Sequence, residues 1–124
     1  MKNRALFPAL LLVLLCAFEA AASEASLEGV YNAAGSNPGG RGSYEGSVTI
    51  TRTGETYKIV WNVGSVFIGT GIVVDEVLSV AYTDENKKWF GFVAYRILNE
   101  GRRLEGLWGP HGGKALGSET LTKR

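Results

Sequence analysis

The sequence predicts an all-β fold, an eight-stranded up-and-down antiparallel barrel, and three observations favour that architecture. Eight short segments alternate apolar with polar residues, which is the two-residue period of a half-buried strand. Turn-forming residues separate the segments, and the longer breaks fall at alternate connections. Beyond residue 22, no segment carries an apolar stripe of helical period with caps, so we expect minimal helix. A flattened barrel or sandwich of the same meander is the alternative.

Residues 1–22 are expected to be a cleaved export signal. A basic start precedes an apolar run at 6–18, and the alanines at 20–22 offer a small-residue cleavage site. The run is shorter than the roughly 20 apolar residues of a membrane-spanning helix, so no stable membrane insertion is expected. Cys16 raises the alternative of a lipoprotein, but Leu15 is large where a lipoprotein signal has a small residue. We therefore expect an unlipidated protein in the periplasm or outside the cell.

Residues 23–124 are expected to fold as a single domain. Removing the signal takes away two of the 13 basic residues and one of the 12 acidic residues, which leaves 11 of each. A neutral chain argues against an electrostatic nucleic-acid binder. The only cysteine lies in the signal, so no disulfide is expected in the domain. All 17 glycines remain, which suits many turns and curved strands.

Period-two alternation and turn residues place the strands. The clearest strand is 43–51, where Tyr44, Val48 and Ile50 alternate with polar residues. Gly69 interrupts the fourth strand, where it indicates a bend needed for closure. The strands are expected at 27–31, 43–51, 57–63, 66–74, 77–82, 89–98, 103–108 and 115–122.

In a meander of eight strands, alternate connections lie at the same end. One end then receives 33–42, 64–65, 83–88 and 109–114, and the other receives the short turns 53–55, 75–76 and 99–102. Aromatic residues lie nearest the first end and, with Tyr57 the exception, aliphatic residues lie nearest the second, so an aromatic mouth is expected over a mainly aliphatic floor. The inward residues are expected to include Val48, Ile50, Ile59, Trp61, Ile68, Ile72, Leu78, Val80 and Leu104.

The aromatic mouth has two interpretations. In the first, bulky rings fill the wide end of a small barrel. In the second, they form a stacking platform for a ring-bearing, sugar or peptide ligand. If a small ligand binds, its contacts are expected from Tyr31, Tyr44, Trp61, Tyr82, Trp89 and Trp108, with polar groups from Asn32, Ser36, Arg41 and His111.

No constellation of residues indicates catalysis, a metal or a cofactor. His111 is the only histidine, and no cysteine accompanies it as a zinc ligand. A Gly-x-Ser-x-Gly elbow is absent. The glycine-rich segment 36–42 lacks the Gly-Lys-Ser/Thr ending of a phosphate loop. The acid pairs at 75–76 and 84–85 lack the ligand spacing of a calcium loop. We therefore expect neither enzyme activity nor a cofactor.

A family resemblance rests on six segments: 31–37, 43–51, 57–61, 69–71, 104–108 and 117–122. They resemble a group of small exported bacterial β-barrel proteins and together cover nearly all of the predicted domain. Some of those proteins carry the label fibronectin-binding, which implies an adhesive or protein-interaction role. Many have a cysteine near the third and fourth strands, and this chain has none there.

A looser resemblance rests on the two ends of the predicted barrel. Residues 29–32 with 35–36, and the ending 117–123, are similar to the opening and closing motifs of avidin-like and lipocalin-like barrels. This resemblance implies a calycin-like barrel and would place Asn32 and Ser36 at ligand-shell positions. Tyrosine replaces the tryptophan of those barrels and the spacing is one residue shorter, so biotin binding is not implied.

We favour an exported, non-enzymatic binding module that uses the aromatic mouth for an unidentified small ligand. One alternative is an adhesive or interaction protein with an extracellular or periplasmic protein as its partner. The other is a purely structural envelope protein.

Overall fold

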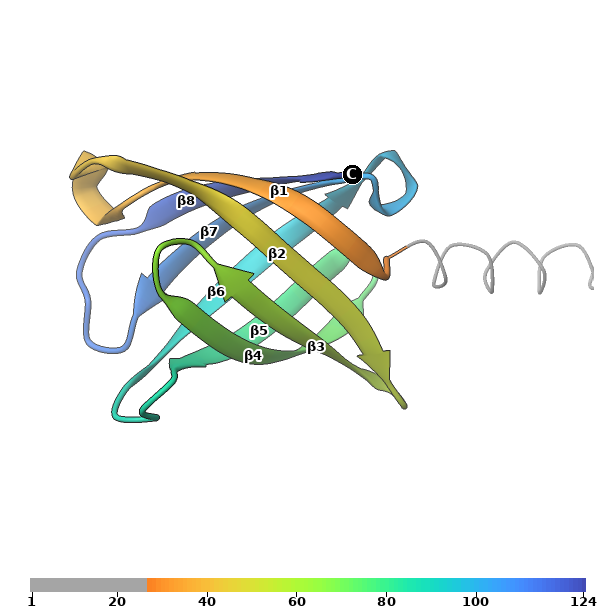
Figure 1. Ribbon diagram of the computed structural model, residues 1–124, viewed down its shortest axis with the longest axis horizontal. Coiled ribbons are helices and arrows are strands. Elements are labelled where there is room, and N and C mark those ends of the chain that lie inside the picture. The colour runs from red at the N-terminus through yellow and green to blue at the C-terminus, as the bar shows by residue number, and fades with distance from the viewer. Residues whose placement is uncertain (1–26) are drawn as a thin grey trace, which may run out of the picture.

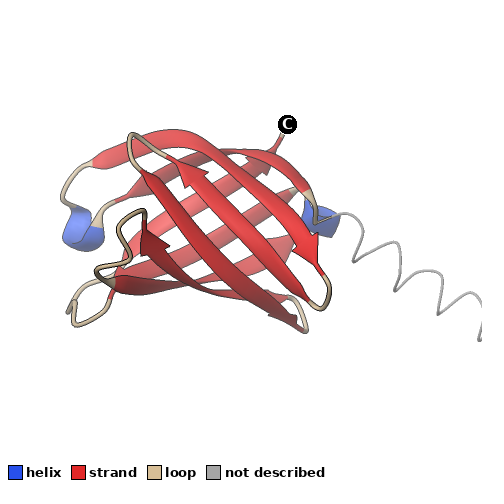
Figure 2. Ribbon diagram, turned by 60° about the horizontal axis from the view of Figure 1, so that its bottom comes forward, coloured by secondary structure: helices blue, strands red, loops and turns tan. Residues whose placement is uncertain are grey.

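The computed structural model describes residues 27–124, which form one β-barrel (Figure 1). The predicted export signal and its cleavage site lie outside the described residues and stay predictions. The strands are β1 (Gly29–Ser36), β2 (Ser43–Thr53), β3 (Thr56–Asn62), β4 (Val66–Val74), β5 (Val77–Asp84), β6 (Phe90–Leu98), β7 (Arg103–Pro110) and β8 (Gly117–Lys123). Two 3-10 turns, η1 (Pro38–Gly40) and η2 (Asn99–Gly101), lie at opposite ends of the barrel (Figure 2).

Each strand pairs antiparallel with the next, and β1 pairs with β8 to close the barrel. The predicted eight-stranded up-and-down barrel is therefore confirmed, and η1 and η2 are the only helical turns in residues 27–124. Closure gives every strand a partner on both sides, so no long sheet edge is left open. We call the end that carries η1 and the connections after β1, β3, β5 and β7 the mouth, and the opposite end the floor.

The first predicted strand was too short. β1 runs to Ser36, and residues 32–36 stay extended because they pair on both sides, with β2 and with β8. Tyr31 was predicted at the mouth, but it lies toward the floor. Its ring is fully buried, and its Oη lies 2.7 Å from the carbonyl oxygen of Leu27 and 2.8 Å from that of Gly101 in η2. The floor thus contains the buried ring of Tyr31 in addition to Tyr57, the aromatic residue expected there.

The barrel interior follows the predicted alternation except in β4. The expected inward residues that are buried are Val48, Ile50, Ile59, Trp61, Leu78, Val80 and Leu104. The prediction was wrong for Ile68 and Ile72, which are 37% and 50% exposed. Gly69 and Gly71 take the inward positions instead. A Cβ on Gly71 would lie only 2.9 Å from the Val80 side chain, so neighbouring side chains already fill that space.

Four inward aromatic rings each lie opposite an inward glycine on a neighbouring strand. The cross-strand partners are Gly35 and Tyr44, Gly91 and Tyr82, Gly106 and Tyr95, and Gly117 and Trp108. A Cβ would lie 2.5 Å from the Tyr82 ring if placed on Gly91, and 2.6 Å from the Tyr95 ring if placed on Gly106. Each ring therefore covers the bare backbone of its partner glycine and lies against the barrel wall.

Two glycines of β7 form a matched test of this packing. Gly106→Ala should cost about 1–3 kcal/mol of unfolding free energy, because the new Cβ overlaps the Tyr95 ring. Gly109→Ala should cost less than about 1 kcal/mol, since its Cβ would meet no atom closer than 3.4 Å. Urea unfolding followed by tryptophan fluorescence measures both values. Equal losses at the two positions would contradict the role of the ring contact.

Candidate functional site

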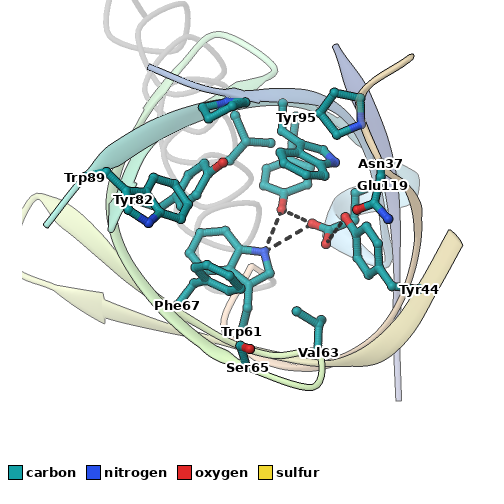
Figure 3. A pocket seen from close by; sticks show the side chains of 14 residues that line it. Asn37, Tyr44, Trp61, Val63, Ser65, Phe67, Tyr82, Trp89, Tyr95 and Glu119 are labelled. Carbon is teal, nitrogen blue, oxygen red and sulfur yellow. Dashed lines mark hydrogen bonds between the residues drawn. The ribbon is translucent and has the colours of Figure 1, made fainter. Parts of the chain in front are cut away.

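A cavity of about 550 Å³ occupies the mouth half of the barrel (Figure 3). Strand interiors supply its walls and the mouth connections supply its rim. The lining side chains are Asn37, Pro38, Tyr44, Trp61, Val63, Ser65, Phe67, Tyr82, Trp89, Val93, Tyr95, Trp108, Pro110 and Glu119. Seven of these residues are aromatic, and Glu119 is the only aspartate, glutamate, lysine, arginine or histidine among them.

Aromatic rings on one side of the cavity contact one another. The centroid of the Tyr82 ring lies 5.6 Å from that of Trp61, 5.8 Å from that of Trp89 and 6.0 Å from that of Phe67. The contacts are tilted or edge-on, which is the arrangement that ring quadrupoles favour. Figure 3 shows Trp89, Tyr82 and Phe67 side by side along this wall. The cluster gives the cavity a continuous aromatic surface.

Glu119 of β8 points into the cavity and accepts hydrogen bonds from three side chains (Figure 3). The residue is only 4% exposed. Its Oε1 accepts from Tyr44 Oη at 3.0 Å, and its Oε2 accepts from Trp61 Nε1 at 3.2 Å and from Tyr95 Oη. The donors belong to β2, β3 and β6. One carboxyl therefore links strands that lie on different sides of the barrel.

Burial and hydrogen bonding act in opposite directions on this carboxyl. Burial raises the pKa of Glu119 above its ordinary value of 4.5, while the hydrogen bonds from Tyr95, Trp61 and Tyr44 lower it, and burial is the larger effect. Burial and the nearby carboxylate raise the pKa of Tyr44 and of Tyr95, so both hydroxyls stay protonated donors. No lysine, arginine or histidine is among the described side chains that line the cavity. Hydrogen bonds alone therefore compensate the charge.

Tyr82 carries an unused polar atom on the same cavity wall. The residue is 8% exposed, and its Oη is buried without a hydrogen-bond partner among residues 27–124. Burial, with a smaller contribution from the charge of Glu119, raises the pKa of Tyr82 to about 12, so the hydroxyl stays neutral. A neutral hydroxyl both donates and accepts. Buried hydroxyls without a partner are uncommon in folded proteins, and this one lies against the backbone of Gly91, where an added Cβ would be 2.5 Å from it.

Half of the predicted contact residues line the cavity: Tyr44, Trp61, Tyr82, Trp89 and Trp108. All three tryptophans of the chain are among them. The structure thus brings these aromatic residues together at the mouth, as expected. Ligand binding by them stays a prediction.

Three of the other predicted contact residues lie away from the cavity. Tyr31 is at the floor, as described above. Asn32 lies outside the barrel, where its Oδ1 accepts a hydrogen bond from Arg124 Nε at 2.8 Å. His111 stacks on Phe90, a half-exposed residue of the outer wall, with 4.4 Å between ring centroids. None of the three belongs to the lining.

The loop between β1 and β2 contributes different residues from those expected. Ser36 and Arg41 were predicted, but Asn37 and Pro38 line the cavity in their place. The reason is the length of β1: Ser36 still pairs with Ser43 in the ladder, so the overhang begins one residue later.

Glu119 was not predicted as a site residue, although the sequence holds a signal for it. Gly117, Glu119 and Leu121 alternate at period two, and all three are buried. Alternation therefore places Glu119 on the inner face. An acidic residue in a strand usually faces solvent, and that expectation hid the pattern. Tyr95 and Phe67 were also missed as lining residues. Each lies among other apolar residues, where the sequence pattern does not distinguish a residue that lines a cavity from one that packs in the core.

The chain matches none of the protein-family models and none of the curated proteins with which it was compared. The resemblances to exported bacterial proteins and to calycins therefore stay untested. Within residues 27–124, no three histidine, cysteine, aspartate or glutamate side chains gather as a metal site. The same residues contain no helix that is both long and apolar enough to cross a membrane.

The charge of Glu119 should make stability depend on pH. Because its folded-state pKa is raised, the folded protein holds this proton more tightly than the unfolded chain does. That contribution is fully present below the ordinary pKa of 4.5, which the unfolded chain keeps, and is lost as pH rises through the folded-state pKa. Glu119→Gln keeps the shape of the side chain but cannot ionise. The unfolding free energy of the variant, relative to wild type, should therefore increase as pH rises through this window.

Urea unfolding at a series of pH values measures that difference. Glu45→Gln is the matched control, because it makes the same chemical change at an exposed residue of β2 that does not line the cavity. A difference between Glu119→Gln and wild type that does not change with pH would contradict the raised pKa.

Proposed function

We propose that this protein is an exported, non-enzymatic binding module that takes a small molecule with a ring or other flat apolar body into its barrel. The observation that carries this proposal is the cavity of about 550 Å³, lined by aromatic side chains and ending on a buried carboxyl. Ligand pockets usually measure roughly 300–1,000 Å³ and combine an apolar wall with a few fixed polar groups. Export rests on the signal-like composition of residues 1–22.

The glycine–ring pairs favour the platform interpretation of the mouth over the plug interpretation. The rings of Tyr82 and Tyr95 lie over Gly91 and Gly106, along the wall, and space remains between the walls. The hydroxyl of Tyr82 supports the same reading. In a barrel filled only for stability, phenylalanine would avoid burying an unpaired hydroxyl, which costs about 1–3 kcal/mol.

An adhesive or protein-interaction role is the second candidate, and an outer apolar patch favours it. Phe90, Phe92, Leu107 and Leu116 are each between 51% and 55% exposed. Gly109 lies between Phe92 and Leu116, so these two side chains are neighbours on the outer wall. Contiguous exposed apolar groups often mark an interaction surface. A protein that works only through this patch would not respond to small molecules.

Neutral ring compounds provide the test of the binding module. We expect 2-phenylethanol, cyclohexylmethanol or phenyl β-glucoside to shift the indole N–H NMR signals of the tryptophans saturably, with Kd in the millimolar range or below, because all three tryptophans line the cavity. Val63→Phe places a larger side chain in the lining and should weaken binding at least tenfold.

Val30→Phe is the control, since Val30 is 39% exposed on the outer wall and the substitution leaves the cavity unchanged. Both variants should remain folded by circular dichroism. If no compound moves the indole signals, or if both variants weaken binding equally, the cavity is not the binding site.

A further inference from the structure

We propose that the cavity selects an organic cation, a molecule whose ammonium group meets Glu119 while its apolar body lies among the aromatic rings. This inference rests on the proposed binding function and adds the charge of the ligand. Three observations carry it: the hydrogen-bond capacity left on Glu119, the charge balance of the lining, and the position of the rings.

The carboxylate of Glu119 has room for one more donor. An ionised carboxylate offers about four acceptor positions. Oε2 accepts from two side chains, Trp61 and Tyr95, whereas Oε1 accepts from Tyr44 alone. Trp61 Nε1 is a donor only, and it shares its single proton between Glu119 Oε2 and Tyr95 Oη, each 3.2 Å away. One acceptor position therefore remains on Oε1 of a side chain that lines the cavity.

The lining favours a positive ligand and disfavours a negative one. Glu119 is the only acidic or basic side chain among the lining residues, so a carboxylate there has no cation beside it. A buried charge without a counter-ion is costly, and an entering ammonium would supply one. An anionic ligand would instead place a like charge close to Glu119 in a poorly solvated site.

The aromatic rings suit the same charge. Trp61 donates to Glu119 at 3.2 Å, so its indole lies directly beside the carboxyl. Tyr44 lies on the Oε1 side at 3.0 Å. Ring faces attract cations, most strongly those of tryptophan, and the attraction grows when water is excluded. An ammonium bound at Oε1 would therefore have aromatic rings as its nearest apolar neighbours.

Three probes of similar shape and different charge test the inference: 2-phenylethylamine, 2-phenylethanol and 3-phenylpropanoate. At neutral pH and low salt, the amine should bind the purified protein at least about tenfold more tightly than the alcohol, and the propanoate most weakly. Glu119→Gln should reduce the affinity for the amine to that for the alcohol. The affinity of this variant for the alcohol should stay within about twofold of the wild-type value. Glu45→Gln should change neither. NMR titration of the indole signals gives all of these affinities.

The pH dependence gives a second readout that needs no variant. The other titratable groups in the lining are Tyr44 on β2, Tyr82 on β5 and Tyr95 on β6, and burial raises the pKa of each hydroxyl away from the acid range. Acidification through the pKa of Glu119 should therefore weaken binding of the amine and leave binding of the alcohol unchanged.

The outcomes separate this inference from the proposed function. If the alcohol binds as tightly as the amine, or if Glu119→Gln weakens both equally, the selection for a cation is wrong and the binding module stands. If the amine, the alcohol and the other neutral ring compounds all fail to bind, both proposals are wrong.

Discussion

The cross-strand pairing of an inward glycine with an inward aromatic ring is the constraint on which the rest of this structure depends. Eight strands enclose a narrow space, and large side chains that stood upright from every wall would meet at its axis. The glycines at positions 35, 91, 106 and 117 instead give their partner rings a bare backbone to cover. The rings then line the wall, so the same residues that pack the barrel also bound its cavity.

The position of Glu119 follows from this arrangement. It occupies an inward position on β8 between Gly117 and Leu121, and the rings laid against the wall bring Tyr44, Trp61 and Tyr95 within reach of its carboxyl. A buried acid weakens a small domain unless its lone pairs are used, and an apolar residue of similar size would often be more stable. The hydrogen-bond network limits that cost. In our proposal the charge that remains selects the ligand, so stability and recognition would both depend on Glu119.

The sequence predicts the barrel well because period-two alternation and turn residues are local signals. Alternation gives the wrong answer where an apolar side chain faces solvent or a charged side chain faces the barrel interior. Ile68 and Ile72 are apolar and face outward, since the inner side of β4 is closed by Val80 and its neighbours and admits only glycine. Glu119 is acidic and faces inward, because donors from three distant strands satisfy it, and such partners are invisible in a local pattern.

The length of β1 shows a further limit of local reasoning. Ala33 and Gly35 have little strand preference of their own, and the pairing with β2 and β8 holds them extended. That extension moves Tyr31 to the floor and leaves Asn37 to overhang the cavity. The aromatic half of the candidate site was therefore predictable, while its polar half depends on contacts between strands that only the folded barrel reveals.

The central claim is that the rings lie along the barrel wall and leave a cavity that is lined by the Glu119 carboxyl. A crystal structure of the protein with 2-phenylethylamine bound tests this claim most directly. The account predicts the ammonium nitrogen within about 3 Å of Glu119 Oε1, with the phenyl ring against the aromatic wall. A cavity filled by rotated side chains, or an amine bound on the outer surface, would contradict it.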